Sequence, residues 1–205
     1  MIDLEKRNLL LGGVAAFAGA GAGATAASGA MPPLAAQDPR ERMRQKHFPN
    51  VPLVTHAGEE VLFYDDLLKD KKVVINFMYS LCEGICSPVT QNIIDARELL
   101  GESAKDIHFY SISLTPATDD PAILREYMEN HEVGKGWTFL TGKPENVDLV
   151  RRRMGFVLRD AKEDADLSNH SGMLRLGNEP MVAWSHASGI TSGRTIARMI
   201  RFELS

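Results

Sequence analysis

Short, uninterrupted runs of apolar residues alternate along most of this chain with segments whose apolar residues recur every three or four positions. Such runs are typical of strands buried on both faces of a sheet, and such periodic segments are typical of helices with one buried face. Strands are predicted at residues 71–81, 106–114 and 137–142, helices at 87–102, 119–133, 143–156 and 192–204, and β-hairpins at 51–64 and 171–185. This order predicts an α/β domain with a mixed central sheet flanked by helices.

Turn and cap residues refine some of these limits. Asp119 or Asp120 is expected to cap the helix that follows, with Pro121 in its first turn. The second hairpin is expected to turn at Gly177 and Asn178.

The first thirty residues differ from all that follows. Lys6 and Arg7 precede an uncharged stretch rich in Ala and Gly, which is the layout of an export signal. The pair resembles a twin-arginine signal with Lys6 in the first arginine position. Residues 8–30 are also long enough to remain as a membrane anchor. Either outcome places the folded part outside the cytoplasm, in the periplasm or at the outer face of the inner membrane.

Residues 31–47 are rich in Pro and then in charge, without apolar periodicity, and this predicts a flexible linker before a domain at 48–205. The chain of 205 residues carries a formal net charge of −4, so no nucleic-acid partner is expected. The run Arg151-Arg152-Arg153 is interpreted as the solvated face of a helix.

Cys82 and Cys86 are the only cysteines in the chain, and they follow the first predicted central strand where it enters a helix. Open α/β sheets place their chemistry at this position. The pair could form a disulfide, exchange electrons with another thiol or bind a metal. A disulfide would close a loop too short to stabilise the fold much, and three intervening residues suit a metal better than thioredoxin-type exchange.

A metal site would need a third ligand, and His170 is the histidine that precedes a strand expected to return to the sheet. Without further context, such a histidine is more often a surface residue or a hydrogen-bonded core residue. Met78, Met173 and Met181 are predicted to fill gaps in the core rather than to bind a metal.

Three stretches resemble the Sco/SenC family, the copper-binding assembly proteins of cytochrome c oxidase. They are residues 48–93 with Cys-x-x-x-Cys, residues 109–127 with an Asp-x-Pro segment, and residues 168–177 with Asn-His-Ser before a strand. The resemblance covers about residues 48–202. It implies a thioredoxin-like fold with an added N-terminal β-hairpin.

The resemblance also implies a copper site made by Cys82, Cys86 and His170. Two soft thiolates and an imidazole suit copper, and a disulfide between the cysteines would abolish binding. The implied function is a metallochaperone that delivers copper to cytochrome c oxidase or another extracytoplasmic cuproenzyme. Its implied partners are an oxidase subunit or other cuproenzyme and a thiol reductant or copper donor protein. Glu83 and Ser87 stand where the family usually has Pro after each cysteine.

Two enzymatic alternatives compete with the chaperone. In a thiol–disulfide oxidoreductase that reduces a cuproenzyme target, Cys82 or Cys86 would be the attacking thiolate and His170 would tune it. A peroxide-reducing enzyme would need one cysteine framed by Pro and Thr with a nearby arginine, which the local residues do not supply. The chain is therefore expected to be a non-enzymatic chaperone or, if an enzyme, a thiol–disulfide oxidoreductase.

Overall fold

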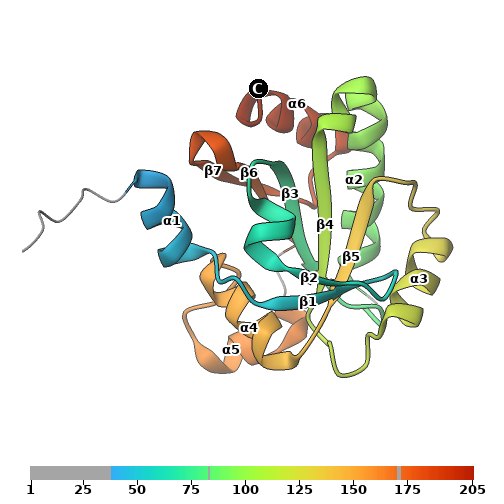
Figure 1. The fold of residues 1–205 in the computed structure, drawn as a ribbon. Helices are drawn as coiled ribbons and strands as arrows, with labels where there is room; N and C mark the ends of the chain where they lie inside the picture. Colours follow the sequence, from blue (N-terminus) through green and yellow to red (C-terminus); the bar gives the residue numbers. More distant parts are fainter. Residues whose placement is uncertain (1–37, 83, 170–171) are drawn as a thin grey trace, which may run out of the picture. The chain divides into compact units, whose positions relative to one another are not determined.

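The computed structural model describes residues 38–82, 84–169 and 172–205. Within these residues, seven strands form one mixed sheet in the order β2-β1-β5-β4-β3-β6-β7 (Figure 1). The strands are β1 (Pro52–Thr55), β2 (Glu60–Leu62), β3 (Lys72–Met78), β4 (Ile107–Ser113), β5 (Trp137–Thr141), β6 (Met173–Asn178) and β7 (Ala183–Ser188). Strands β3, β4 and β5 are parallel, and the other neighbours pair antiparallel. The predicted α/β fold with a mixed sheet and an N-terminal hairpin is confirmed.

Helices cover both faces of the sheet. One core cluster joins the sheet to α2 (Cys86–Leu100), α3 (Pro121–Asn130) and α6 (Gly193–Glu203). The other joins it to the π-helix η1 (Phe63–Leu68) and to α4 (Pro144–Arg153). The remaining described elements are α1 (Pro39–His47), α5 (Ala161–Ala165) and the 3-10 helices η2 (Gly101–Asp106), η3 (Leu167–Asn169) and η4 (Glu179–Met181).

The side chains of β3 point alternately into the two core clusters. Val74 and Met78 pack in the cluster with α2, whereas Val73, Ile75 and Phe77 pack in the cluster with α4. All five side chains are at most 2% exposed. Burial on both faces explains why this strand has a continuous apolar run rather than an alternating pattern.

The structure decides the position of one predicted helix cap and corrects the position of one predicted turn. Asp120, rather than Asp119, caps α3 by accepting hydrogen bonds from the N–H groups of Ala122 and Ile123. The second hairpin is present, but its turn lies at residues 179–182, because Gly177 and Asn178 still pair with β7.

Two predictions about exposure need correction. Met181 is predicted to fill the core, but it lies in the turn between β6 and β7 and is 68% exposed. The solvated-face interpretation holds for Arg152 and Arg153 but not for Arg151, whose side chain is 14% exposed and pairs with Asp164.

The linker prediction is wrong for residues 39–47, which form helix α1. Asp38 caps this helix and Pro39 occupies its first turn, a combination that favours a helix start. The mean hydropathy of α1 is low and it contains no buried residue, which is why apolar periodicity gave no sign of it. Residues 1–37, including the proposed leader, lie outside the described residues. No helix within the described ranges is both long and apolar enough to cross a membrane.

Helix α1 is attached to the domain through a buried carboxylate. Glu179, which is 3% exposed, accepts hydrogen bonds from Arg40 Nε at 2.6 Å and from Arg40 Nη2. It also accepts from the Tyr64 hydroxyl at 2.7 Å and from the Asp70 N–H at 2.8 Å. Four donors thus compensate the desolvation of one carboxylate, as buried charges require.

This arrangement predicts that Arg40→Ala lowers the free energy of unfolding by about 2–3 kcal/mol, because it leaves the buried Glu179 carboxylate without its counter-ion. Arg42→Ala is the matched control, since Arg42 is exposed on the same helix. Urea unfolding of both variants checks the difference. Equal losses in the two variants would contradict a specific role for the Arg40–Glu179 pair.

Candidate functional site

The two cysteines lie where β3 leaves the sheet and α2 begins. Strand β3 ends at Met78, and α2 starts at Cys86, the first residue of the helix. Cys86 is 3% exposed and packs in the core cluster with α2, while Cys82 is partly buried against the same cluster. Both thiols are free, and they are hydrogen-bonded to each other. The structure therefore brings Cys82 and Cys86 together at the predicted edge of the sheet.

The two thiols differ strongly in acidity. Burial acts to raise the pKa of Cys82, but hydrogen bonds from the Cys86 thiol, from the N–H groups of Cys86 and Gly84, and from Tyr79 outweigh it and lower that pKa. Burial, together with the hydrogen bond to Cys82, raises the pKa of Cys86 to about 12. Cys82, the more accessible sulfur, is therefore the more acidic thiol of the pair, and Cys86 holds its proton more tightly.

A buried aspartate fixes the loop that carries Cys82. The Asp119 carboxylate is 1% exposed and accepts hydrogen bonds from Ser80 Oγ at 2.5 Å and from the Ser80 N–H at 3.2 Å. It also accepts from Ser113 Oγ at 2.6 Å and from Thr115 Oγ1 at 3.0 Å. Asp119 thus ties the segment after β3 to the end of β4. From the sequence it was only one of two possible helix caps.

A second polar chain runs along the other side of α2. Ser87 Oγ lies 3.0 Å from His131 Nε2, and His131 Nδ1 lies 2.9 Å from the carbonyl oxygen of Tyr127. The Tyr127 hydroxyl in turn contacts Thr90 Oγ1 at 2.9 Å. Since the carbonyl can only accept, Nδ1 carries a proton, and Ser87 can donate to a neutral Nε2. The sequence gave no sign of this contact, which joins residues 44 positions apart.

The third predicted site residue, His170, lies outside the described residues, but its flanks are described. Asn169 ends η3, and its side-chain amide donates to the carbonyl oxygen of Glu163 at 3.1 Å. Gly172 packs against the start of α2, where a Cβ on it would lie 3.0 Å from Val89 Cγ2 and 3.1 Å from Ile85 Cδ1. Its φ of +59° also favours glycine.

No group of three or more His, Cys, Asp and Glu side chains that could hold a metal occurs within the described ranges. The predicted set of Cys82, Cys86 and His170 includes a residue beyond those ranges. Two thiols in contact, one of them with a lowered pKa, form the two-sulfur part of a soft-metal site.

The thiol pair predicts a pH-dependent reaction with iodoacetamide. Only the thiolate reacts, so the alkylation rate of Cys82 should be half-maximal at a lower pH than that of an unperturbed thiol, because its pKa is lowered. In Cys86→Ala this midpoint should move to higher pH, because Cys82 loses a hydrogen-bond donor. In Cys82→Ala, the remaining Cys86 should react slowly. Equal rates for the two cysteines, measured by mass spectrometry, would contradict the assignment.

The Asp119 contacts predict that Asp119→Ala lowers the free energy of unfolding by about 2–4 kcal/mol, because three hydroxyl groups lose their acceptor. Asp120→Ala removes only a helix cap and should cost about 1 kcal/mol. Urea unfolding of the two neighbouring variants provides the comparison. A loss in Asp119→Ala no greater than in Asp120→Ala would contradict the proposed role.

Comparison with known proteins gives consistent matches. The model of the family described as SCO1/SenC matches residues 40–204. The "SCO1 protein homolog" of Bacillus subtilis is 32% identical over 111 residues, which are 44% of this chain and 58% of that protein. This chain thus spans little more than half the length of that relative.

Solved structures share the fold. ScoI of Bradyrhizobium japonicum with copper bound superposes with a TM-score of 0.60 at 21% identity, covering 76% of this chain and 99% of that one. BsSco, a member of the Sco family of cytochrome c oxidase assembly proteins in which a disulfide switch is identified, gives 0.60 at 19% identity, covering 75% and 91%. These likenesses confirm the predicted thioredoxin-like fold. Since the family match extends over nearly the whole described domain, the chain belongs to the SCO1/SenC family.

Proposed function

We propose that this protein is a copper-binding accessory protein that delivers copper to cytochrome c oxidase or another extracytoplasmic cuproenzyme. The observation that carries the proposal is the contact between the Cys82 and Cys86 thiols at the junction of β3 and α2. Two adjacent sulfur donors favour copper over harder metals, and a site with few ligands can release its ion to a partner. The copper-bound structure of the Bradyrhizobium japonicum relative supports this choice of metal.

His170 is the proposed third ligand. Gly172 lies against Ile85 and Val89, on either side of Cys86. His170 is two residues before Gly172 in the chain, and this proximity in sequence to the start of α2 supports it as the ligand. An imidazole nitrogen would then complete a site of two sulfurs and one nitrogen.

The same thiols would make copper binding depend on redox state. Formation of a Cys82–Cys86 disulfide releases two electrons and two protons to an oxidised thiol partner and removes both sulfur ligands. Reduction by a dithiol partner reverses this and restores the site. The disulfide switch identified in BsSco supports this proposal.

A thiol–disulfide oxidoreductase is the second candidate, and the unequal acidity of the thiols favours it. Cys82 has the lowered pKa and the greater exposure, so it would attack the disulfide of a target. Cys86 is adjacent and would release the mixed disulfide by forming a bond with Cys82. The net reaction reduces the target and leaves Cys82 and Cys86 oxidised.

Both candidate functions require that the chain is exported from the cytoplasm. We propose that residues 1–30 direct the protein across the inner membrane, where they are cleaved or kept as an anchor through residues 8–30. The domain would then act in the periplasm, where a thiol reductant must keep the cysteines reduced.

Anaerobic copper titration of the reduced protein tests the proposal. The wild type should bind one copper ion, whereas Cys82→Ala, Cys86→Ala and His170→Ala should each lose most of the affinity. His108→Ala is the matched control, because His108 is exposed near the opposite end of β4. Absorption and electron paramagnetic resonance would report the sulfur and nitrogen ligands.

Disulfide exchange with a small disulfide separates the two candidates. If His170→Ala loses copper binding and keeps its exchange rate, the metal function is supported. If the reduced wild type takes up no copper, the chaperone proposal is wrong and the oxidoreductase remains.

A further inference from the structure

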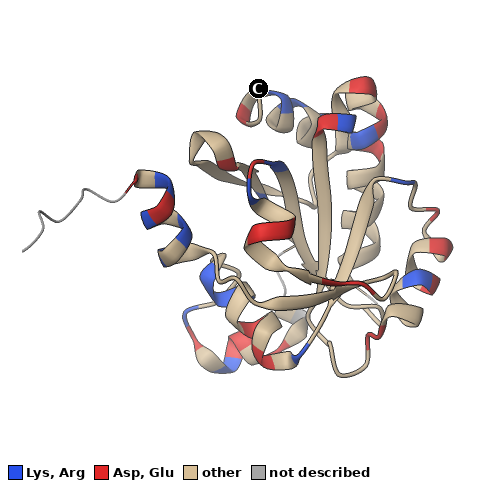
Figure 2. Cartoon of the chain, viewed as in Figure 1, with Lys and Arg blue, Asp and Glu red and all other residues tan. Residues whose placement is uncertain are grey.

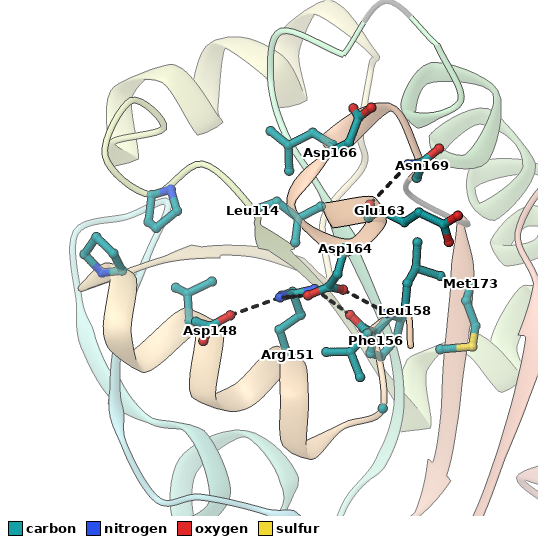
Figure 3. A pocket seen from close by; sticks show the side chains of 16 residues that line it. Leu114, Asp148, Arg151, Phe156, Leu158, Glu163, Asp164, Asp166, Asn169 and Met173 are labelled. Atoms are coloured by element: carbon teal, nitrogen blue, oxygen red, sulfur yellow. Dashed lines mark hydrogen bonds and ion pairs between the residues drawn. The ribbon is translucent and has the colours of Figure 1, made fainter. Parts of the chain in front are cut away.

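A pocket of about 480 Å³ lies between the end of β4, helix α4, helix α5 and the start of β6 (Figure 3). Its volume is in the range of pockets that bind small molecules or a few side chains of a partner. None of the copper-site residues proposed above contributes to its wall among the residues that the structure describes.

The pocket has an apolar interior. Leu114, Val147, Phe156, Leu158 and Met173 line it, and they come from segments far apart in the sequence. Val147 and Phe156 are buried, whereas Leu158 is 39% exposed at the rim. An apolar side chain entering this space would therefore lose contact with water and bury its surface against these residues.

The wall of the pocket carries an excess of negative charge. Among the residues that line it are four carboxylates, those of Asp148, Glu163, Asp164 and Asp166, and one guanidinium, that of Arg151. Figure 2 shows further Lys and Arg residues on α4 and α5. Apart from Arg151 they do not line the pocket, but Arg152 pairs with Asp148 at 2.7 Å and lies 3.9 Å from Asp164.

Arg151 is already neutralised by its neighbours. Its Nη1 and Nη2 both lie 2.7 Å from Asp164 oxygens, Nη2 lies 3.1 Å from Asp148, and Nη1 donates to the carbonyl oxygen of Phe156 (Figure 3). Glu163 is exposed, and its carboxylate takes part in no salt bridge within the described part of the chain. The pocket thus presents the charge of Glu163 to an incoming group, whereas Asp148 and Asp164 are paired with arginines.

The pocket lies near the edge of the sheet that carries the thiol pair, but on the other face: Val147, Phe156 and Met173 belong to the core cluster with α4, whereas Cys82 and Cys86 pack in the cluster with α2. The N–H of Leu114 donates to the carbonyl oxygen of Met78 at 2.7 Å, at the end of the strand that leads to Cys82. Asn169 and Met173, which also line the pocket, stand on either side of position 170 in the chain. A partner that binds in the pocket and extends around this edge of the sheet would reach the thiol pair.

We propose that this pocket is the docking site of the protein that receives the copper, and that it takes an apolar side chain from a segment in which Lys or Arg residues flank that side chain. The proposal rests on the proposed copper-delivery function and names the chemistry of its partner. The apolar interior provides the anchor, and the carboxylates at the rim select for basic neighbours.

Three blocked pentapeptides serve as probes: Gly-Lys-Leu-Lys-Gly, Gly-Glu-Leu-Glu-Gly and Gly-Lys-Gly-Lys-Gly. Binding at millimolar peptide is followed by NMR of ¹³C-methyl methionine, in which Met173 reports on the pocket and Met199 on α6 serves as the internal control. The Lys-Leu-Lys peptide should shift the Met173 signal and not that of Met199. The other two peptides should bind several-fold more weakly.

Charge reversal of the rim tests the role of the carboxylates. Glu163→Lys should weaken binding of the Lys-Leu-Lys peptide by about threefold or more, since attraction becomes repulsion. Glu98→Lys is the matched control, because Glu98 is exposed on α2, does not line the pocket and gives the same change in net charge. Its affinity should equal that of the wild type.

An unchanged Met173 signal, or equal affinity for all three peptides, would overturn the proposed docking site. Equal effects of Glu163→Lys and Glu98→Lys would overturn the role of the rim. Copper titration of the same samples separates failure of the docking site from failure of the proposed function. Loss of peptide binding with intact copper uptake rejects only the docking site. Absence of copper uptake rejects the copper function itself.

Discussion

The burial of β3 on both faces is the constraint on which the site depends. Val73, Ile75 and Phe77 face one core cluster, and Val74 and Met78 face the other. The strand pairs with β4 along its whole length and with β6 along most of it, so its register cannot slip without exposing apolar side chains. The chain therefore leaves the sheet at a fixed point after Met78, and the cysteines follow within eight residues.

A buried charge then determines the shape of the loop after β3. Asp119 can lie at the sheet edge, almost fully buried, only because hydroxyl groups from Ser80, Ser113 and Thr115 all donate to it. The same contacts connect the loop before Cys82 with the loop after β4, which leads to the apolar pocket. One carboxylate thus links the segment that leads to Cys82 with the segment after β4, which contains the pocket residue Leu114.

The elements predicted from the sequence are those whose stability is local or periodic. The apolar run was enough to predict β3, and Pro121 with the Asp pair before it was enough to predict the start of α3. The place of the two cysteines after β3 was enough to predict where the thiol site lies. Helix α1 could not be predicted because its stability comes from Arg40 pairing with Glu179, 139 residues away. Arg151 was misjudged for the same reason, since its partner Asp164 lies on a different helix. His170 stood out among the histidines by its place before a strand, but only the resemblance made it a ligand, since neither periodicity nor spacing shows what its side chain binds.

The position after Cys86 shows how this chain keeps its site while departing from the family pattern. A proline there would restrict the backbone at the start of α2 and would have no N–H and no polar side chain. Ser87 instead contacts His131, which is oriented by the carbonyl oxygen of Tyr127 on α3. Pro88 still lies in the first turn of α2, where a missing N–H costs no helical hydrogen bond. The start of α2 is thus stabilised by the Ser87–His131 contact as well as by the restricted backbone of Pro88. Cys86 keeps its buried position beside Cys82.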